Sequence, residues 1–356
     1  MSDDTPLRTQ LTAAGAVFQM LDGDSVAAHF GDPTAEETAL LDGVGVCDAS
    51  RRTQIAVSGE DRAAFLHNMC TNEIRKLPVC AGCETFLTNA QGRILAYGHV
   101  FCEPDRLILE TVPGQAAAII EHLDRYIIRE KVELADLTEE RAELLLGGPK
   151  AGSLIQSLVE QDVPPTNLAH RQVEISGSLV NVRCVELIGR GSYLLDCPAG
   201  GVAELWRTLC SAGATPCGEL AADAARIATA VPAYGRDITD KNLPQEIGRN
   251  RQAISFTKGC YIGQETVARI DALGHVNRLL VKLQFAGKEV PRPGDPLTTG
   301  GAEVGQVTSA AFCHRLQAAI ALAYVRRGQD AAGTLLQSAA GDATVQPPAT
   351  EGGRSP

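Results

Sequence analysis

One short segment gathers residue types that could do chemistry together. Residues 258–265 read Lys-Gly-Cys-Tyr-Ile-Gly-Gln-Glu, so a cation, a thiol nucleophile and a carboxylate acceptor share one loop. Two glycines bracket Cys260, and glycine is used where the backbone turns sharply or approaches another group closely. Arg269 follows Glu265 by four residues, the spacing of neighbours on one helical face. We therefore predict that this segment carries the function, with Cys260 as its key thiol.

The elements around this segment would decide how reactive the thiol is. Residues 264–268 favour a helix that begins near Gly263, which would place Cys260 and Tyr261 just before its first turn. Free backbone N–H groups at a helix N-terminus favour anions. Together with a nearby Lys258 they would make the thiol more reactive. The alternative is structural, a glycine-rich turn around a half-buried cysteine.

Other residues whose side chains could do chemistry give weaker signals. Cys80 and Cys83 form a lone CxxC pair, and no second pair with suitable spacing completes a zinc site. The pair precedes an apparent strand, whereas a thioredoxin-like motif would open a helix after a strand. Packing is the simpler interpretation, and a redox role stays open. The histidines are scattered and predict no metal site; His275 is of interest because it follows the predicted helix.

Composition limits the class of protein. A chain of 356 residues is too long for one ordinary core, so two or three domains are expected. A net charge of -11 disfavours nucleic acid and anionic membranes as partners. We find no secretory signal and no apolar run of the roughly 18 residues that a membrane span needs. Eleven scattered cysteines then predict reduced thiols and a cytoplasmic location.

Hydrophobic patterning predicts a mixed α+β fold. Residues 1–30 are interpreted as a helical lead-in, and strands and helices then alternate without a regular βαβ rhythm. Short strand-like runs separated by turns fill residues 275–336 and predict a small barrel or sandwich. Residues 337–356 are rich in small and polar residues, so we expect a disordered tail there.

Five segments together resemble one known family. Residues 243–246 (Leu-Pro-Gln-Glu) and 254–265 (Ile-Ser-Phe-Thr-Lys-Gly-Cys-Tyr-Ile-Gly-Gln-Glu) closely resemble the YgfZ-type folate-binding proteins. These are relatives of the glycine cleavage T-protein that act in iron–sulfur cluster assembly and repair. Residues 57–66, 87–94 and 304–309 are similar to T-protein segments and occur in the same order. The octapeptide of residues 258–265 is highly specific and the other three T-protein-like pieces are moderately so, and the resemblance extends over most of the chain.

The resemblance implies an aminomethyltransferase-like fold of three modules in a ring around a central opening that binds tetrahydrofolate. Residues 1–50 and 138–240 would form a discontinuous folate-binding α+β domain, into which an α+β domain of residues 51–137 is inserted. Residues 241–274 would be the connection that bears the motif. Residues 275–336 would form the C-terminal barrel.

Three departures from the T-protein pattern matter for activity. The resemblance implies an aspartate pair after the strand start at Gly92, one of which handles folate amine chemistry, but Ala96 and Tyr97 stand there. No glutamate follows Arg226 where such enzymes have one, and Cys260 replaces an acid. Folate binding could survive these losses, whereas methylene transfer could not.

The leading hypothesis is a tetrahydrofolate-binding protein that supports assembly or repair of iron–sulfur enzymes, with Cys260 as the reactive or cluster-proximal thiol. Its partners would be folate and iron–sulfur enzymes or assembly proteins. The resemblance and the loop chemistry together nominate the binding residues Lys258, Gly259, Tyr261, Gly263, Gln264, Glu265, Arg269, Glu246 and Tyr234. Among these, Glu246 would accept hydrogen bonds from a pterin ring, and Tyr234 opens a turn similar to one in the family.

Two other hypotheses compete with it. The whole-chain resemblance to the T-protein favours a folate-dependent aminomethyltransferase, against which the missing acids near Ala96 argue. A redox or metal-binding module built on Cys80, Cys83 and Cys260 would require these thiols to converge in space. The folate species, the client enzymes and the oligomeric state do not follow from the sequence.

Overall fold

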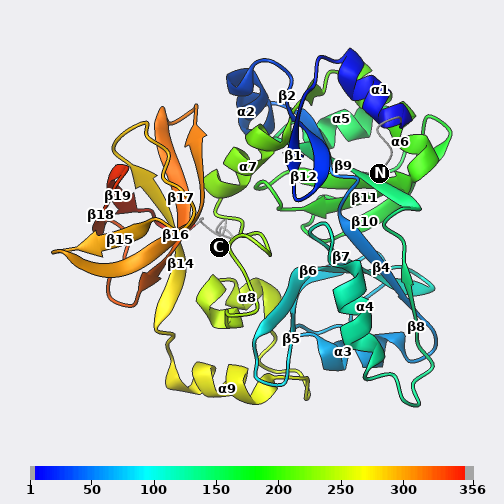
Figure 1. Cartoon of the computed structure of the whole chain (residues 1–356). Helices are drawn as coiled ribbons and strands as arrows, with labels where there is room; N and C mark the ends of the chain where they lie inside the picture. The colour runs from blue at the N-terminus through cyan, green and yellow to red at the C-terminus, as the bar shows by residue number, and fades with distance from the viewer. Residues whose placement is uncertain (1–4, 349–356) are drawn as a thin grey trace, which may run out of the picture.

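The computed structural model describes residues 5–348 and contains three large β-assemblies (Figure 1). They are a six-stranded sheet, a five-stranded sheet and a closed six-stranded barrel; a two-stranded hairpin lies near the N-terminus. Helices pack on both sheets, so the mixed α+β class predicted from the sequence is confirmed.

The N-terminal segment is only partly helical, in contrast to our expectation for residues 1–30. It comprises α1 (Pro6–Ala13), β1 (Val17–Leu21), β2 (Asp24–His29) and then α2 (Pro33–Asp42). Asp22 and Gly23 turn the hairpin with φ of 53° and 89°. An Asp-Gly pair in this conformation is typical of a tight two-residue hairpin turn, and it outweighs the helical tendency of the flanking residues.

The six-stranded sheet combines sequence from both sides of residues 53–136. Its strand order is β10-β11-β12-β9-β3-β13. The strands are β3 (Gly45–Asp48), β9 (Arg141–Gly147), β10 (His170–Ile175), β11 (Ser178–Val185), β12 (Ser192–Pro198) and β13 (Thr215–Pro216). The accompanying helices are α5 (Ala151–Leu158), the 3-10 turn η1 (Ala199–Gly201), α6 (Val202–Ser211) and α7 (Glu219–Ala228). Trp206 of α6, only 2% exposed, is the largest side chain of this core.

The five-stranded sheet is built entirely from residues between β3 and β9. Its order is β5-β6-β7-β4-β8. The elements are β4 (Thr53–Ser58), α3 (Arg62–Met69), β5 (Gly82–Thr88), β6 (Ile94–Cys102), β7 (Arg106–Thr111), α4 (Ala116–Asp124) and β8 (Glu133–Asp136). Because β3 and β9 pair directly with each other, the five-stranded unit is an insertion into the six-stranded one.

The two sheets contact each other through an apolar cluster and a buried polar network. Phe101 and Ile108 of the inserted sheet pack in one cluster with Leu145 and Leu194 of the first sheet. Beside them Arg183 forms ion pairs with Glu143 at 2.7 Å and Asp196 at 3.1 Å, and all three side chains are 1% exposed. The Gln54 amide of β4 donates to Asp196 at 3.2 Å, so the network crosses between the sheets.

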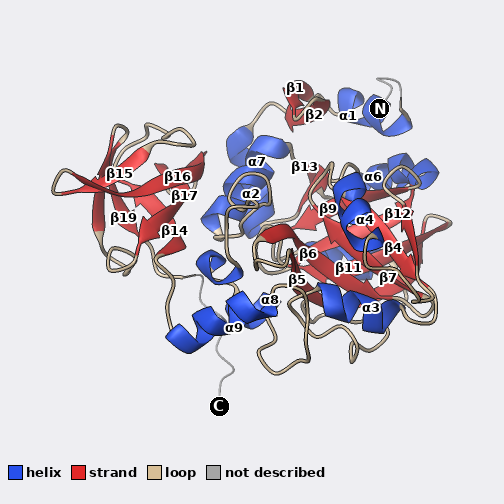
Figure 2. Cartoon of the chain, turned by 60° about the horizontal axis from the view of Figure 1, so that its bottom comes forward, coloured by secondary structure: helices blue, strands red, loops and turns tan. Residues whose placement is uncertain are grey.

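The connection and the barrel complete the chain. The 3-10 turn η2 (Pro244–Ile247), α8 (Asn250–Ala253) and α9 (Gln264–Leu273) lead to the barrel, which closes in the order β14-β17-β16-β15-β18-β19 (Figure 2). Its strands are β14 (Arg278–Phe285), β15 (Pro296–Thr299), β16 (Ala302–Cys313), β17 (Ala318–Arg326), β18 (Leu335–Ser338) and β19 (Gly341–Val345).

The barrel extends further than the sequence suggested. Residues 337–345, which we expected in a disordered tail, form most of the β18–β19 hairpin, and β19 pairs with β14. Small side chains such as Ala343 are enough here, because strand pairing rather than large apolar residues closes the barrel. Residues 349–356 of the expected tail lie outside the described part of the chain.

One buried ion pair ties the barrel to the rest of the molecule. Arg226 of α7 donates to Asp237 at 2.7 Å and to the Ser309 hydroxyl of β16 at 2.8 Å. Asp237 also accepts from Thr308 of β16 at 2.5 Å. The turn that follows α7 is therefore fastened to the barrel wall by charge-assisted hydrogen bonds, which are stronger than neutral ones.

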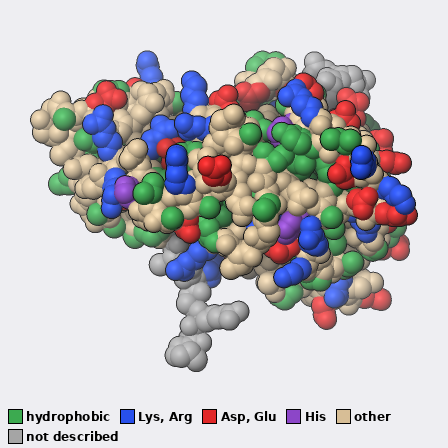
Figure 3. All heavy atoms as spheres, turned by 90° about the horizontal axis from the view of Figure 1, so that it is seen from below, with side chains coloured by type: hydrophobic (Ala, Val, Ile, Leu, Met, Phe, Trp, Pro, Cys, Tyr) green, Lys and Arg blue, Asp and Glu red, His purple; other side chains and the backbone are tan. Residues whose placement is uncertain are grey.

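The outer surface is mixed in charge. In the space-filling view, acidic side chains are most frequent at the end opposite the barrel (Figure 3). Within residues 5–348 no helix is long and apolar enough to cross a membrane.

Candidate functional site

The loop before α9 is fastened to the inserted domain through the side chain of Lys258. Its ammonium group donates to the backbone carbonyls of His67, Cys70 and Asn72 at 2.5, 2.7 and 2.7 Å, and it lies 5.0 Å from the ring of Tyr261. Burial lowers the pKa of Lys258 to about 8. Because the three N–H donors of an ammonium are all used by carbonyls, Lys258 serves to hold the loop in place.

Cys260 is presented to solvent on this fastened loop. Its side chain and the neighbouring Gly259 are exposed, while Tyr261 is 8% exposed and packs in a cluster at the junction of the modules. The next residue, Ile262, donates from its backbone N–H to the Asn68 carbonyl at 3.0 Å. The α9 helix begins at Gln264, as the sequence predicted, so the thiol lies four residues before that helix.

The two glycines of the loop play different parts. Gly263 has a φ of +83°, and a Cβ there would lie 2.5 Å from the Asn89 carbonyl oxygen and 2.9 Å from the Gly92 Cα. Gly259 has open space around it and does not have a positive φ. The close approach expected of a glycine therefore applies to Gly263 alone.

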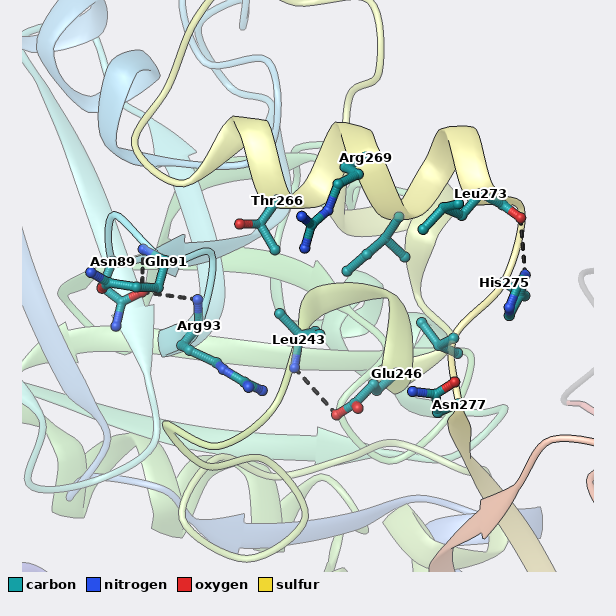
Figure 4. Close-up of a pocket in the computed structure, with 12 residues that line it drawn as sticks. Asn89, Gln91, Arg93, Leu243, Glu246, Thr266, Arg269, Leu273, His275 and Asn277 are labelled. Carbon is teal, nitrogen blue, oxygen red and sulfur yellow. Dashed lines mark hydrogen bonds between the residues drawn. The ribbon is translucent and has the colours of Figure 1, made fainter.

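The α9 residues named from the sequence face outward or towards a pocket. Gln264 is half-buried, whereas Glu265 and Arg269 are exposed. Their spacing suits an ion pair, but none joins them in the described part of the chain. Arg269 instead lines a pocket of about 580 Å³ together with Glu246 (Figure 4). His275 also lines this pocket, and its Nδ1 lies 2.9 Å from the Leu273 carbonyl.

Glu246 is buried but already well supplied with donors. Its carboxylate accepts two hydrogen bonds from Arg278 at 3.1 Å each, one from the Asn242 amide at 3.2 Å and one from the Leu243 N–H at 3.3 Å. A carboxylate has about four lone-pair positions. Three of these donors bind Oε2 and only the Arg278 Nε binds Oε1, so Oε1 is the oxygen with a lone pair left for a pterin ring.

Tyr234 lies in the turn between α7 and the connection. It is half-buried against the cluster that contains Phe86, Tyr97, Tyr261 and Tyr324, and burial raises its pKa. This cluster draws on the inserted sheet, the connection and the barrel, so it marks the point where the three meet.

The structure adds a site that sequence reasoning missed, at the position where an acid pair was expected. Ala96 is 1% exposed in the core of the inserted domain, whereas the Tyr97 hydroxyl donates to Glu84 at 2.8 Å. Arg249 binds the same carboxylate through Nε and Nη2 at 2.5 and 2.6 Å. A single charged residue, Glu84, within the otherwise uncharged strand β5 was the only sequence signal for this triad.

The two thiols of the CxxC pair lie in different environments. Cys80 is exposed, whereas Cys83 is 9% exposed and packs in the core of the inserted domain. Desolvation raises the pKa of the Cys83 thiol above its usual range. Among the described residues no group of three or more His, Cys, Asp or Glu side chains could hold a metal ion. The geometry therefore gives no support to a module built on Cys80, Cys83 and Cys260.

Comparison with known families decides the class of this fold. A model described as the GCVT N-terminal domain matches residues 7–258, and one described as the glycine cleavage T-protein C-terminal barrel domain matches residues 278–349. The chain belongs to the GCVT family. The expected aminomethyltransferase-like architecture with its C-terminal barrel is thereby confirmed, while the narrower resemblance to YgfZ-type proteins remains a hypothesis.

This GCVT-family chain is similar to several named proteins. A chloroplastic protein of Arabidopsis thaliana named as a transferase is 31% identical over 288 residues, which span 80% of this chain and 66% of that protein. An aminomethyltransferase of Nostoc sp. is 29% identical over 331 residues, 90% of this chain and 85% of that protein. The crystal structure of the glycine cleavage system aminomethyltransferase T from Bartonella henselae superposes with a TM-score of 0.88 at 20% identity, covering 98% of both chains.

Proposed function

We propose that this GCVT-family protein binds tetrahydrofolate or a derivative and supports the assembly or repair of iron–sulfur enzymes, with Cys260 as its functional thiol. The observation that carries the proposal is the triad at Glu84. The family fold is kept along the whole chain, yet the place expected to hold the catalytic acids of a methylene transferase holds Ala96 and Tyr97.

The state of Glu84 argues against aminomethyl transfer. A general base needs an oxygen within hydrogen-bond reach of the proton that it removes. Both oxygens of Glu84 already accept from Arg249, and one of them also accepts from Tyr97. The carboxylate that the Tyr97 hydroxyl contacts is therefore committed to a structural ion pair.

Folate binding is supported by the family and by the aromatic cluster at the module junction. Aminomethyltransferases of this family use tetrahydrofolate, and flat heterocycles bind well beside aromatic side chains in largely apolar sites. Tyr261 belongs to the loop of residues 258–265, Tyr234 belongs to the turn after α7, and both pack in this cluster. In this proposal the Lys258–Glu265 loop forms one wall of the site, and Lys258 fixes that wall in place.

Calorimetric titration with a panel of folates tests the ligand. We expect saturable binding of at least one reduced folate and no turnover of an aminomethylated carrier protein in its presence. The alternative function, an aminomethyltransferase, is favoured by named relatives that match about nine-tenths of the chain. Turnover at the rate of a glycine cleavage enzyme would establish the alternative and refute our preference.

Complementation tests the thiol. In a strain that lacks a YgfZ-type protein, wild-type protein should restore iron–sulfur enzyme activity and Cys260→Ala should not. Cys80→Ala is the matched control, because Cys80 is likewise exposed but lies on the inserted domain. Equal restoration by wild type and Cys260→Ala would show that the thiol has no such role.

A further inference from the structure

The pocket between α9 and the inserted domain has the chemistry of an anion site. It is bounded by the β5–β6 turn, by η2, by α9 and by the segment that leads into the barrel (Figure 4). Its volume of about 580 Å³ lies within the range of small-molecule sites. Cys260 is not among its lining residues, so the pocket is distinct from the thiol.

Two guanidinium groups reach the pocket from opposite walls. Arg93 extends from the start of β6 and donates to the Lys241 carbonyl at 2.6 Å, which fixes its direction without neutralising its charge. Arg269 projects from α9 towards the same space. Within residues 5–348 the Arg269 guanidinium forms no ion pair or hydrogen bond, so its five donors remain available.

The pocket offers no free negative charge against these cations. Glu246 is the only acid among the described lining residues, and Arg278 already binds both of its oxygens. The other polar lining side chains include the amides of Asn89, Gln91 and Asn277. In a chain of net charge -11, a cavity with two uncompensated arginines is a local exception.

We propose that this pocket binds a small organic anion with two or more carboxylates, one held by Arg93 and another by Arg269. Guanidinium groups match carboxylates through paired hydrogen bonds, and two of them on separate elements suit a ligand with separated charges. Such a ligand would bridge α9 and the inserted domain. Two sources share this chemistry, the glutamate tail of a folate and a free di- or tricarboxylate.

The packing next to the pocket makes the two walls rigid. The Asn89 side-chain oxygen accepts the N–H groups of Gln91 and Arg93, both at 3.0 Å, which sets the β5–β6 turn. A Cβ on Gly92 of this turn would lie 2.8 Å from the Thr266 side chain of α9. Because turn and helix are in close contact, the separation of Arg93 and Arg269 is set before any ligand binds, which lowers the entropy cost of binding.

Calorimetry on the full-length protein tests this proposal with probes that lack a pterin ring, so it can fail independently of the proposed function. The probes are citrate and a γ-linked triglutamate peptide. We expect one of them to bind, and Arg93→Gln and Arg269→Gln each to weaken that binding about tenfold, the effect of losing a charged hydrogen bond. Arg207→Gln is the control, because Arg207 is an exposed arginine of α6 outside the pocket.

The results of these titrations distinguish the two possible sources of the carboxylates. Preference for triglutamate, together with competition by a polyglutamylated folate, would identify the folate tail; preference for citrate would identify a free carboxylate. Absence of binding of both probes, or binding that both pocket variants keep at wild-type strength, would overturn the proposal. Unfolding curves of each variant guard against loss of binding through misfolding.

Discussion

Gly263 of the thiol-bearing loop and Gly92 of the β5–β6 turn lie in direct backbone contact. A Cβ on Gly263 would lie 2.9 Å from the Gly92 Cα, and a Cβ on Gly92 would lie 3.2 Å from the Gly263 carbonyl oxygen. Both residues also have positive φ, at +83° and +75°. This contact fixes the start of α9, and with it the position of the preceding Cys260, against the inserted domain.

Gly263→Ala should therefore destabilise the protein, because the methyl group meets backbone that cannot move away and the φ is unfavourable for alanine. We expect a loss of about 2–4 kcal/mol in the free energy of unfolding, the sum of overpacking and backbone strain. Urea denaturation measures this loss. The matched control is Gly259→Ala, which has open space and should change stability by less than about 0.5 kcal/mol. Equal effects of the two substitutions would contradict the contact.

Lys258→Met should loosen the loop, because it leaves three largely buried carbonyls of the inserted domain without their donor. We expect a loss of about 2–4 kcal/mol in unfolding free energy and faster proteolysis of residues 254–263. Lys131→Met is the control, since Lys131 is 69% exposed and pairs only with the exposed Glu60. A normal stability combined with altered alkylation of Cys260 would instead indicate that Lys258 acts on the thiol.

Part of this site could be predicted from the sequence, and the reason differs from residue to residue. The helix start after Gly263 follows from local residue preferences, which act over a few neighbours. The hydrogen-bond partners of the Lys258 ammonium group could not be predicted, because all three are backbone carbonyls of residues 67–72. Every residue has a backbone carbonyl, so the pattern of side chains does not indicate which carbonyls accept a hydrogen bond.

The same contrast holds for the fold. Asp22 and Gly23 carried a clear hairpin signal, so the β1–β2 hairpin was predictable even though we expected a helix there. The barrel strands after residue 336 were harder, because Ala343 and Val345 are buried by neighbouring strands rather than by their own size. Glu84, Tyr97 and Arg249 are separated by up to 165 positions, so only the tertiary fold brings them together.

Asp237→Asn should weaken the link between α7 and the barrel. The substitution removes the charge that balances the buried Arg226, and Asp223 at 2.6 Å offsets only part of the loss. We expect a decrease of about 3 kcal/mol in unfolding free energy, as for other buried ion pairs that lose one partner. Asp42→Asn, at an exposed pair with Arg315, should have little effect. If both variants unfold like the wild type, the Arg226–Asp237 pair does not stabilise the junction.

Glu110, in the network between the two sheets, should make the protein sensitive to acid. Burial opposes its ionisation, but the Arg52 guanidinium and a hydrogen bond with His99 outweigh burial and lower the pKa of Glu110 from 4.5 to about 2. Because the folded pKa lies below the unfolded one, the carboxylate stabilises the fold above pH 4.5, and this stability is lost as the pH falls towards 2.

Glu110→Gln should remove that contribution, which a shift of this size places at about 3 kcal/mol. The difference in unfolding free energy between wild type and variant should be largest near neutral pH and should shrink steadily as the pH falls below about 4.5. Urea denaturation at a series of pH values measures it. Glu121→Gln, in an exposed pair with Arg125 on α4, is the control and should leave the pH profile unchanged. A constant difference between wild type and Glu110→Gln across the series would mean that the carboxylate does not titrate in this range, and the ion pair with Arg52 would then not be the source of acid sensitivity.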